Sequence, residues 1–415
     1  MSFNLIKLSC AIVAFFSCSA EQITSSSKEG EHGIDTLQNA EELMTEEVTV
    51  LPGACQIEAY LPLLQGKKVA VVANQASRVG DAHLVDSLLA LGVTIEKIFT
   101  PEHGFRGNVD AGAHVNDAVD AKTGLSLVSL YGNNKKPSVE QLKQVDVMLF
   151  DLQDVGVRFY TYISTLHYVM EACAALNIPL VLLDRPNPNA HYIDGPVLEE
   201  GYTSFVGMHP VPVVYGMSIG EYAQMINGEY WLNDSLNCEL KVIPILHWDH
   251  QTVYELPIAP SPNLPNQLSI YLYPSLCFFE GTVVSVGRGT DHPFQLFGHP
   301  KFADSTFAFT PVSTPGKSLR PPHENVVCFG KSLSSLSLEE VRNMKCLNLN
   351  YLIEAYQKTN VNSFFSAPKF FNLLAGNNSL MEQVKRGETA EQIRASWQSD
   401  LSEFKKLRAQ YLIYP

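Results

Sequence analysis

The chain has 415 residues, of which 46% are hydrophobic and 17% are charged. This composition is typical of a globular protein and excludes disorder along the whole chain. The net charge of −14 argues against nucleic acid as a partner, because phosphate binding requires clustered lysines and arginines. A chain of this length is expected to hold two domains, or one domain with a substantial appendage.

The first 20 residues have the pattern of a secretory signal peptide. Lys7 precedes an apolar stretch that is too short to span a bilayer and is followed by Ser17-Cys18-Ser19-Ala20. Two outcomes are open: lipidation of Cys18, which we favour, or release of a soluble protein after Ala20. Residues 21–52 are polar and acidic and are expected to form a flexible linker. We therefore expect an exported protein, either periplasmic or anchored to the membrane as a lipoprotein.

Continuous apolar runs alternate with helical periodicity from residue 66 onward. The runs at 68–74, 94–99, 145–150 and 178–183 are typical of buried strands, and 83–91 and 162–176 have helical spacing. This alternation predicts a mostly parallel sheet with helices on both faces. We predict an α/β fold, with a Rossmann-like, doubly wound sheet forming a catalytic domain over residues 53–262.

A cluster of three prolines at 260–265 interrupts this pattern and marks the predicted domain boundary. We predict a second, smaller α/β domain over residues 263–415 that completes a cleft. It contains a strand-like run at 281–286 and helical patterns at 338–344 and 389–412.

Polar side chains follow four of the predicted strands. In open α/β sheets, ligands bind beyond the carboxyl ends of the strands, so these side chains are expected to converge on one pocket. They are Asn74 and Gln75; Glu102, His103 and Arg106; Asp151 and Asp154, with Arg158, Tyr160 and Tyr162; and Asp184, Arg185 and Asn187.

Glu102 is the strongest catalytic candidate because it follows a strand directly, on a backbone that Pro101 stiffens. A carboxylic acid in a partly desolvated cleft can donate a proton to a leaving oxygen. The alternative is a structural ion pair with Arg106. Asp151 and Asp154 are candidates for a second carboxylate, which glycosidic cleavage usually needs, or for helix caps.

Other polar residues suit a sugar acid. Arg158 and Arg185 are candidates to hold a carboxylate, because a guanidinium matches its geometry. Tyr160 and Tyr162 are candidates to stack on a sugar ring, although aromatic residues at a helix start more often pack in a core. In the second domain, a glycine-rich segment groups Glu280, Arg288 and Asp291. We expect that segment to face the pocket.

The segment Gly216-Met-Ser-Ile-Gly220 is a formal G-x-S-x-G motif. It admits two interpretations: a nucleophile elbow of a serine esterase, or a helix cap in which Ser218 and Glu221 form a capping box. We favour the cap. No phosphate-binding loop, HExxH or true GxGxxG is present, and the histidines are dispersed, so we expect no metal site.

Several long motifs resemble those of the exo-β-N-acetylmuramidase family, formerly a family of unknown function. They include Pro101-Glu-His-Gly-Phe-Arg-Gly107, residues 151–162, Asp184-Arg-Pro-Asn-Pro188, His209-Pro-Val-Pro212 and residues 280–291. The resemblance runs from about residue 66 to the C-terminus. It implies release of N-acetylmuramic acid from the non-reducing end of peptidoglycan fragments, without a cofactor, with Glu102 as the catalytic residue.

The resemblance and the strand ends together define the expected site. The expected catalytic residues are Glu102 with Asp151, Asp154 or Glu280 as its partner. The expected substrate-binding residues are Asn74, Gln75, His103, Arg106, Arg158, Tyr160, Tyr162, Asp184, Arg185, Asn187, His209, Arg288 and Asp291. Two alternatives to a glycosidase are a serine esterase using Ser218 and a non-catalytic lipoprotein that binds cell-wall sugars.

Overall fold

A computed structural model describes residues 49–102, 104–106 and 118–415. The predicted signal peptide with Cys18, most of the predicted linker, and His103 lie outside these residues. The last linker residues are described, and Leu51 forms a two-way backbone bridge with Leu246. No helix of the described part is long and apolar enough to cross a membrane.

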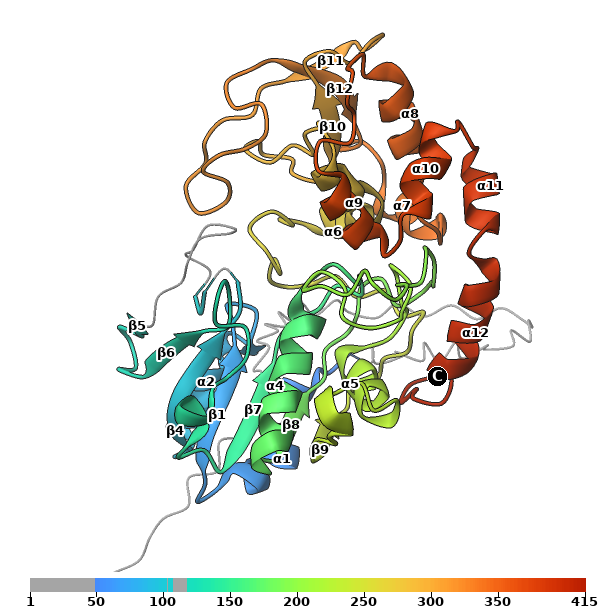
Figure 1. Cartoon of the computed structure of the whole chain (residues 1–415). Helices are drawn as coiled ribbons and strands as arrows, with labels where there is room; N and C mark the ends of the chain where they lie inside the picture. Colours follow the sequence, from blue (N-terminus) through green and yellow to red (C-terminus); the bar gives the residue numbers. More distant parts are fainter. Residues whose placement is uncertain (1–48, 103, 107–117) are drawn as a thin grey trace, which may run out of the picture. The chain divides into compact units, whose positions relative to one another are not determined.

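A seven-stranded sheet forms the first half of the fold, as Figure 1 shows. Its strand order is β5-β6-β4-β1-β7-β8-β9, and all neighbouring pairs are parallel except β5 with β6. The six parallel strands follow the Rossmann order 3-2-1-4-5-6. The strands are β1 (Lys68–Ala73), β4 (Thr94–Thr100), β5 (Ala118–Val119), β6 (Ser126–Ser129), β7 (Val147–Asp151), β8 (Leu180–Leu183) and β9 (Leu240–Ile243).

Alternate residues of the central strands point to opposite faces of the sheet, so two apolar cores form. Val69 and Val71 of β1 belong to one core and Ala70 and Val72 to the other. Both faces are therefore covered, which confirms the doubly wound α/β prediction. The helices of this half are α1 (Ile57–Leu64), α2 (Leu84–Ala90), α3 (Val139–Leu142), α4 (Tyr162–Leu176) and α5 (Ile219–Gly228); the pair β2 (Arg78–Val79) and β3 (Ala82–His83) forms a separate hairpin.

The second half is smaller and mixes helices with an antiparallel sheet of order β10-β12-β11. One of the two apolar cores runs from the first half into the second without a break, through Phe159, Phe278 and Phe371. The elements are α6 (Gln267–Leu276), β10 (Leu296–His299), β11 (Phe307–Phe309), β12 (Cys328–Ser332), α7 (Leu338–Asn343), α8 (Asn350–Lys358), α9 (Pro368–Ala375), α10 (Ser379–Lys385), α11 (Ala390–Ala395) and α12 (Gln398–Arg408).

Two predicted elements of this half are wrong. Residues 281–286 form no strand; Ser285 makes only an isolated bridge with Gly298. The helix predicted over 389–412 is two helices, α11 and α12, that end and begin around Trp397. The indole Nε1 of Trp397 donates to buried Asp194 at 3.1 Å, a tertiary contact that helical periodicity does not reveal.

Candidate active site

A cleft of about 300 Å³ lies at the carboxyl edge of the parallel sheet. Its walls come from the residues after β4 and β6, the start of α4 and residues 205–206 in the first half, and from α6, α9 and the segment 280–294 in the second. The residues that line it are Glu102, Tyr131, Phe159, Tyr160, Thr161, Tyr162, Phe205, Val206, Ser261, Asn263, Leu264, Tyr273, Glu280, Arg288, Phe294 and Phe370. The cleft therefore combines two carboxylates and one guanidinium with many aromatic rings.

The pairing of β4 with β6 places Glu102 beside Tyr131. Thr100 and Ser129 are partners in this parallel pair, and the backbone N–H of Leu130 donates to the Thr100 carbonyl at 2.8 Å. Glu102 and Tyr131 each follow two residues later. Burial raises the pKa of the Tyr131 phenol above its usual value, and the charge of Glu102 and a hydrogen bond with it raise that pKa further. Tyr131 thus stays protonated and donates to Glu102.

Tyr160 and Tyr162 form the floor of the cleft at the start of α4. The Tyr160 hydroxyl donates to the carbonyl of Pro260 at 2.9 Å, and the Tyr162 hydroxyl accepts from the Asn74 side chain at 2.8 Å. Their rings meet edge to face with centroids 4.7 Å apart. Burial raises the pKa of both phenols, so both remain neutral hydrogen-bonding groups.

Glu280 and Arg288 form an ion pair on the opposite wall. The Arg288 Nε lies 2.7 Å from Glu280 Oε1, and the guanidinium lies over the ring of Phe294 at 5.1 Å. Burial lowers the pKa of Arg288, but the charge of Glu280 and its hydrogen bond outweigh this effect and raise it. The sequence-based expectation that this segment faces the pocket agrees with the geometry.

Comparisons with known proteins agree with this arrangement. Residues 69–268 match the N-terminal domain model of the exo-β-N-acetylmuramidase NamZ family, and residues 271–414 match its C-terminal domain model. The chain belongs to the NamZ family.

Relatives of the NamZ family extend over most of the chain. The peptidoglycan β-N-acetylmuramidase NamZ of Bacillus subtilis is 37% identical over 372 residues, which are 86% of this chain and 89% of the relative. Crystal structures of two DUF1343 family proteins from Bacteroides fragilis match with TM-scores of 0.82 and 0.73, at 46% and 29% identity. Each covers 88% of this chain and 99% of its own. The prediction of a glycosidase of this family is confirmed.

In this NamZ family chain, two of the carboxylates expected as partners of Glu102 lie outside the cleft. Asp151 is fully buried and accepts two hydrogen bonds from Arg185, at 2.6 and 2.8 Å, so this pair occupies both its oxygens. Asp154 is buried beside Tyr215, whose hydroxyl donates to it, and burial raises the pKa of Asp154 to about 6. Both residues therefore form contacts inside the protein. So does Arg185, which was expected to bind substrate.

Arg158 also lies outside the cleft. It is fully buried, and its guanidinium donates to the carbonyls of Pro196, Val211, Leu374 and Ala375 at 2.7 to 3.0 Å. Two of these acceptors belong to α9, so Arg158 joins the two halves of the fold. The expectation that Arg158 holds a substrate carboxylate is wrong, because the Arg158 side chain is not accessible to solvent.

Arg106 supports the loop that carries Glu102 and does not line the cleft. Its guanidinium donates to both oxygens of Asp120 at 2.8 Å and lies 3.5 Å from Asp86. These two carboxylates are the ion-pair partners that the structure gives to Arg106. Residues 107–117, which follow in the sequence, lie outside the described residues.

The remaining expected binding residues lie behind or beside the cleft lining. Asn74 holds Tyr162, and the Gln75 side chain donates to the carbonyls of Ala259 and Pro260 at 3.2 Å. Asp184, Asn187 and His209 are buried in internal hydrogen bonds, with Ser218, Met217 and Tyr222 among their respective partners. Asp291 is exposed at the end of the segment that carries Arg288.

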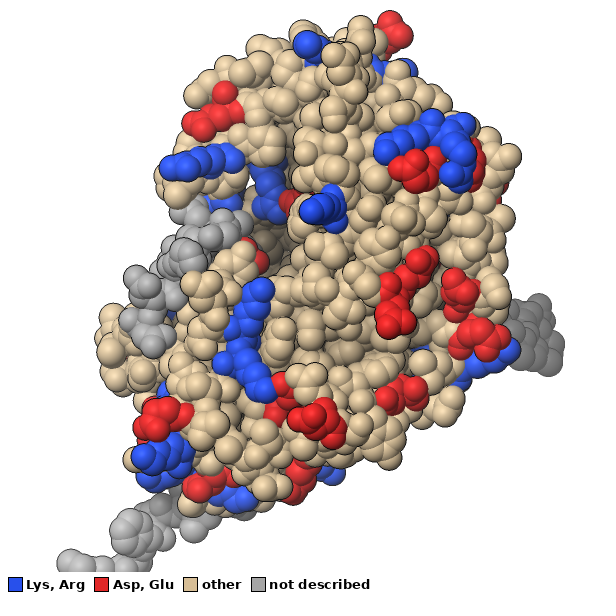
Figure 2. Space-filling model, viewed as in Figure 1, with Lys and Arg blue, Asp and Glu red and all other residues tan. Residues whose placement is uncertain are grey.

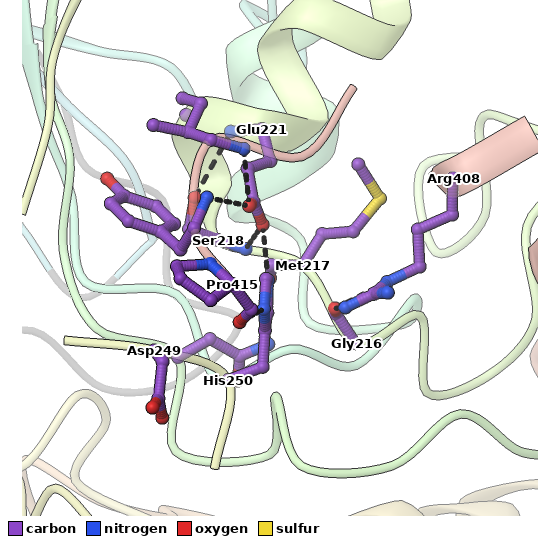
Figure 3. A network of polar contacts seen from close by, with 12 residues as sticks. Gly216, Met217, Ser218, Glu221, Asp249, His250, Arg408 and Pro415 are labelled. Carbon is purple, nitrogen blue, oxygen red and sulfur yellow. Dashed lines mark hydrogen bonds and ion pairs between the residues drawn. The ribbon is translucent and has the colours of Figure 1, made fainter. Parts of the chain in front are cut away.

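Ser218 is a helix cap, as Figure 3 shows. It is fully buried at the start of α5, accepts from the backbone N–H of Glu221 at 3.1 Å and donates to Asp184 at 2.7 Å. Glu221 accepts in return from the Ser218 backbone at 2.9 Å and from His250 at 2.9 Å. A hydroxyl buried and bonded in this way cannot reach an ester, so the capping interpretation is confirmed.

Tyr131 is one of several cleft residues that the sequence patterns did not indicate, together with Phe205 and Phe370. It follows β6, a strand of only four residues whose apolar run, Leu127 and Val128, is too short to stand out. The signal that could have found it is the polar position directly after that run. Within the described residues, no group of His, Cys, Asp and Glu side chains is arranged to hold a metal ion.

Proposed function

We propose that the protein is an exo-acting glycoside hydrolase that releases N-acetylmuramic acid from the non-reducing end of peptidoglycan fragments. The supporting observation is the position of Glu102 at the carboxyl edge of the sheet, in a cleft whose opposite wall carries the Glu280–Arg288 ion pair. In this account Glu102 acts as acid and base at the glycosidic oxygen.

The charged groups of the cleft suit a sugar acid. Of the arginines that the sequence singled out, Arg288 lines the cleft, whereas Arg106, Arg158 and Arg185 bind other parts of the protein. A guanidinium is suited to a carboxylate such as the lactyl group of N-acetylmuramic acid. Glu280 holds Arg288 in place and reduces the net charge that the substrate meets.

The size of the cleft supports an exo mode of action. A volume of about 300 Å³ lies at the lower end of the range of small-molecule sites and suits one amino sugar better than a long chain. The half-buried rings of Phe205 and Phe370 stand on opposite walls and provide apolar surface for a sugar.

Product analysis with two chemically defined substrates tests this proposal. The enzyme should release free N-acetylmuramic acid from a fragment that ends in this sugar at its non-reducing end. It should leave a fragment uncut when N-acetylglucosamine caps that end. Cleavage of the capped fragment, or release of oligosaccharides as the first products, would show that the exo assignment is wrong.

We also propose that the protein is exported and anchored through a lipid on Cys18, on the strength of the apolar stretch and the Ser17-Cys18-Ser19-Ala20 sequence. Metabolic labelling with a palmitate analogue tests this. The native chain should incorporate label into the membrane fraction, and Cys18→Ala should abolish the label. Equal labelling of both would rule out this anchor.

A further inference from the structure

Several lysine and arginine side chains without a described carboxylate partner lie on the segments around the cleft. Elsewhere on the surface of this acidic protein, some lysines pair with carboxylates, as Lys122 does with Asp86 at 2.7 Å and Lys406 with Glu403 at 2.7 Å, while others, such as Lys241, form no ion pair with a described carboxylate. Four cations on the segments around the cleft also form no ion pair with any described carboxylate. We call these four the cationic rim: Lys135, Lys317, Arg320 and Lys369.

The first two members of the cationic rim, Lys135 and Lys369, flank the cleft from opposite halves of the fold. The Lys135 ammonium lies 4.6 Å from the ring centre of Phe205, which lines the cleft. Lys369 is an exposed residue at the start of α9 and directly precedes Phe370, which lines the other wall.

The other two members lie on the loop between β11 and β12. Asn263, which lines the cleft, donates to the Lys317 carbonyl at 2.9 Å and fixes that loop at the edge. Arg320 is exposed and precedes Pro321, which packs against Gly289, the neighbour of Arg288. Figure 2 shows Lys and Arg side chains above and below the hollow in this face of the molecule.

The cleft itself holds charges of both signs: the carboxylate of Glu102, and the Arg288 cation paired with Glu280. Asp291 is an exposed acidic residue on the segment 280–294, which carries Glu280 and Arg288. The cationic rim therefore attracts anionic groups that stay outside the cleft, where the part of the substrate beyond the cleaved bond must lie.

We propose that the cationic rim binds carboxylates on the leaving part of the substrate. Because this inference rests on the proposed function, the carboxylates are the lactyl groups of further N-acetylmuramic acid residues in the glycan. The enzyme then prefers longer acidic glycan fragments over a disaccharide whose leaving sugar is neutral. Lysines that are exposed, as Lys369 is, or partly exposed, as Lys135 and Lys317 are, suit this role because their flexible stems adapt to carboxylates at different positions.

Three peptide-free substrates test this inference with the full-length enzyme. They are an aryl N-acetylmuraminide whose leaving group is uncharged, the disaccharide of N-acetylmuramic acid and N-acetylglucosamine, and the tetrasaccharide of two such units. A fourth substrate is the tetrasaccharide with its inner lactyl group converted to a methylamide. The tetrasaccharide should show a kcat/KM several-fold above that of the disaccharide, and the methylamide should lose this advantage.

Variants of the cationic rim test which residues cause the preference for the tetrasaccharide. Lys135→Gln and Lys369→Gln should each reduce the tetrasaccharide-to-disaccharide ratio of kcat/KM by about two- to fivefold, as expected for one exposed ion pair. Raising the NaCl concentration to 0.5 M should reduce the same ratio. Lys241→Gln is the matched control, because Lys241 is an exposed lysine on β9 and should leave the ratio unchanged.

Equal cleavage of the tetrasaccharide and its methylamide would overturn the inference. So would a double variant, Lys135→Gln with Lys369→Gln, that keeps the native tetrasaccharide-to-disaccharide ratio of kcat/KM. If the native enzyme cleaves none of the substrates, the proposed function fails, and this inference with it. The aryl muraminide separates the two outcomes, because it is cleaved without any contact to the rim.

Discussion

Glu102 and Tyr131 lie side by side because they follow, by two residues each, the paired residues Thr100 and Ser129 of β4 and β6. The phenol of Tyr131 is a hydrogen-bond partner of the Glu102 carboxylate. This contact belongs to the sheet edge itself, so its geometry is set by the register of two parallel strands. Tyr131 is therefore a neighbour of Glu102 that the strand register provides, and Glu280, one of the three carboxylates expected as the partner of Glu102, lines the same cleft.

Tyr131→Phe should lower kcat on an aryl N-acetylmuraminide by about 10- to 100-fold and change KM little, because a misplaced catalytic group costs rate more than binding. The position of Glu102 depends on the lost hydrogen bond, so the pH dependence of kcat should shift as well. Tyr230→Phe is a control, since Tyr230 is 62% exposed. An unchanged kcat and pH profile would remove Tyr131 from the site.

Arg288→Lys should reduce kcat/KM for an N-acetylmuraminide by about 10- to 100-fold, because lysine keeps the charge but cannot form the paired hydrogen bonds of a guanidinium with the lactyl carboxylate. The corresponding N-acetylglucosaminide lacks that carboxylate, so any weak activity on it should change much less. Steady-state kinetics on the two aryl glycosides measure the difference. Equal losses on both would mean that Arg288 does not recognise the lactyl group.

Arg158→Met should destabilise the fold by about 3 kcal/mol or more, because four buried carbonyl groups lose their donor. Burial already lowers the pKa of Arg158 to about 9, which reflects the cost of keeping this charge in the interior. Urea unfolding followed by circular dichroism measures the change. A variant with native stability but a raised KM would instead make Arg158 a substrate ligand.

The contribution of Asp154 and Asp184 to stability should fall as the pH rises from about 4 to 7, whereas that of His191 and His299, whose pKa values burial lowers to about 4, should rise over the same range. Burial raises the pKa of Asp154 and of Asp184 from 3.8 to about 6, so folding favours their protonated forms. The stability that these protons supply is fully present below pH 3.8 and is lost as the pH rises through about 6. Each group accounts for up to about 3 kcal/mol of this change.

Asp154→Asn should remove the Asp154 contribution to the pH dependence of stability, because an amide resembles the protonated carboxyl group and does not titrate. Thermal unfolding of the native chain and the variant across this pH range measures the effect. A variant whose profile parallels that of the native chain would contradict the raised pKa of Asp154.

The sequence was sufficient for the sheet and for the location of Glu102, because both depend on local patterns. Long apolar runs mark β1, β4, β7 and β8, and the polar residues after them mark the functional edge. It was insufficient for the roles of Arg158 and Asp151, because a strand end does not reveal whether a charged side chain turns inward. Their partners, Ala375 and Arg185, are distant in sequence.

The central claim is that Glu102 performs the chemistry, and Glu102→Gln measured on a chromogenic N-acetylmuramic acid glycoside tests it most directly. Glu96→Gln, the same change on β4, the strand that precedes Glu102, at the ion pair with Lys68, is the matched control. We predict that Glu102→Gln lowers kcat by at least about 100-fold while Glu96→Gln stays near the native value. Near-native turnover by a folded Glu102→Gln variant would contradict the assignment.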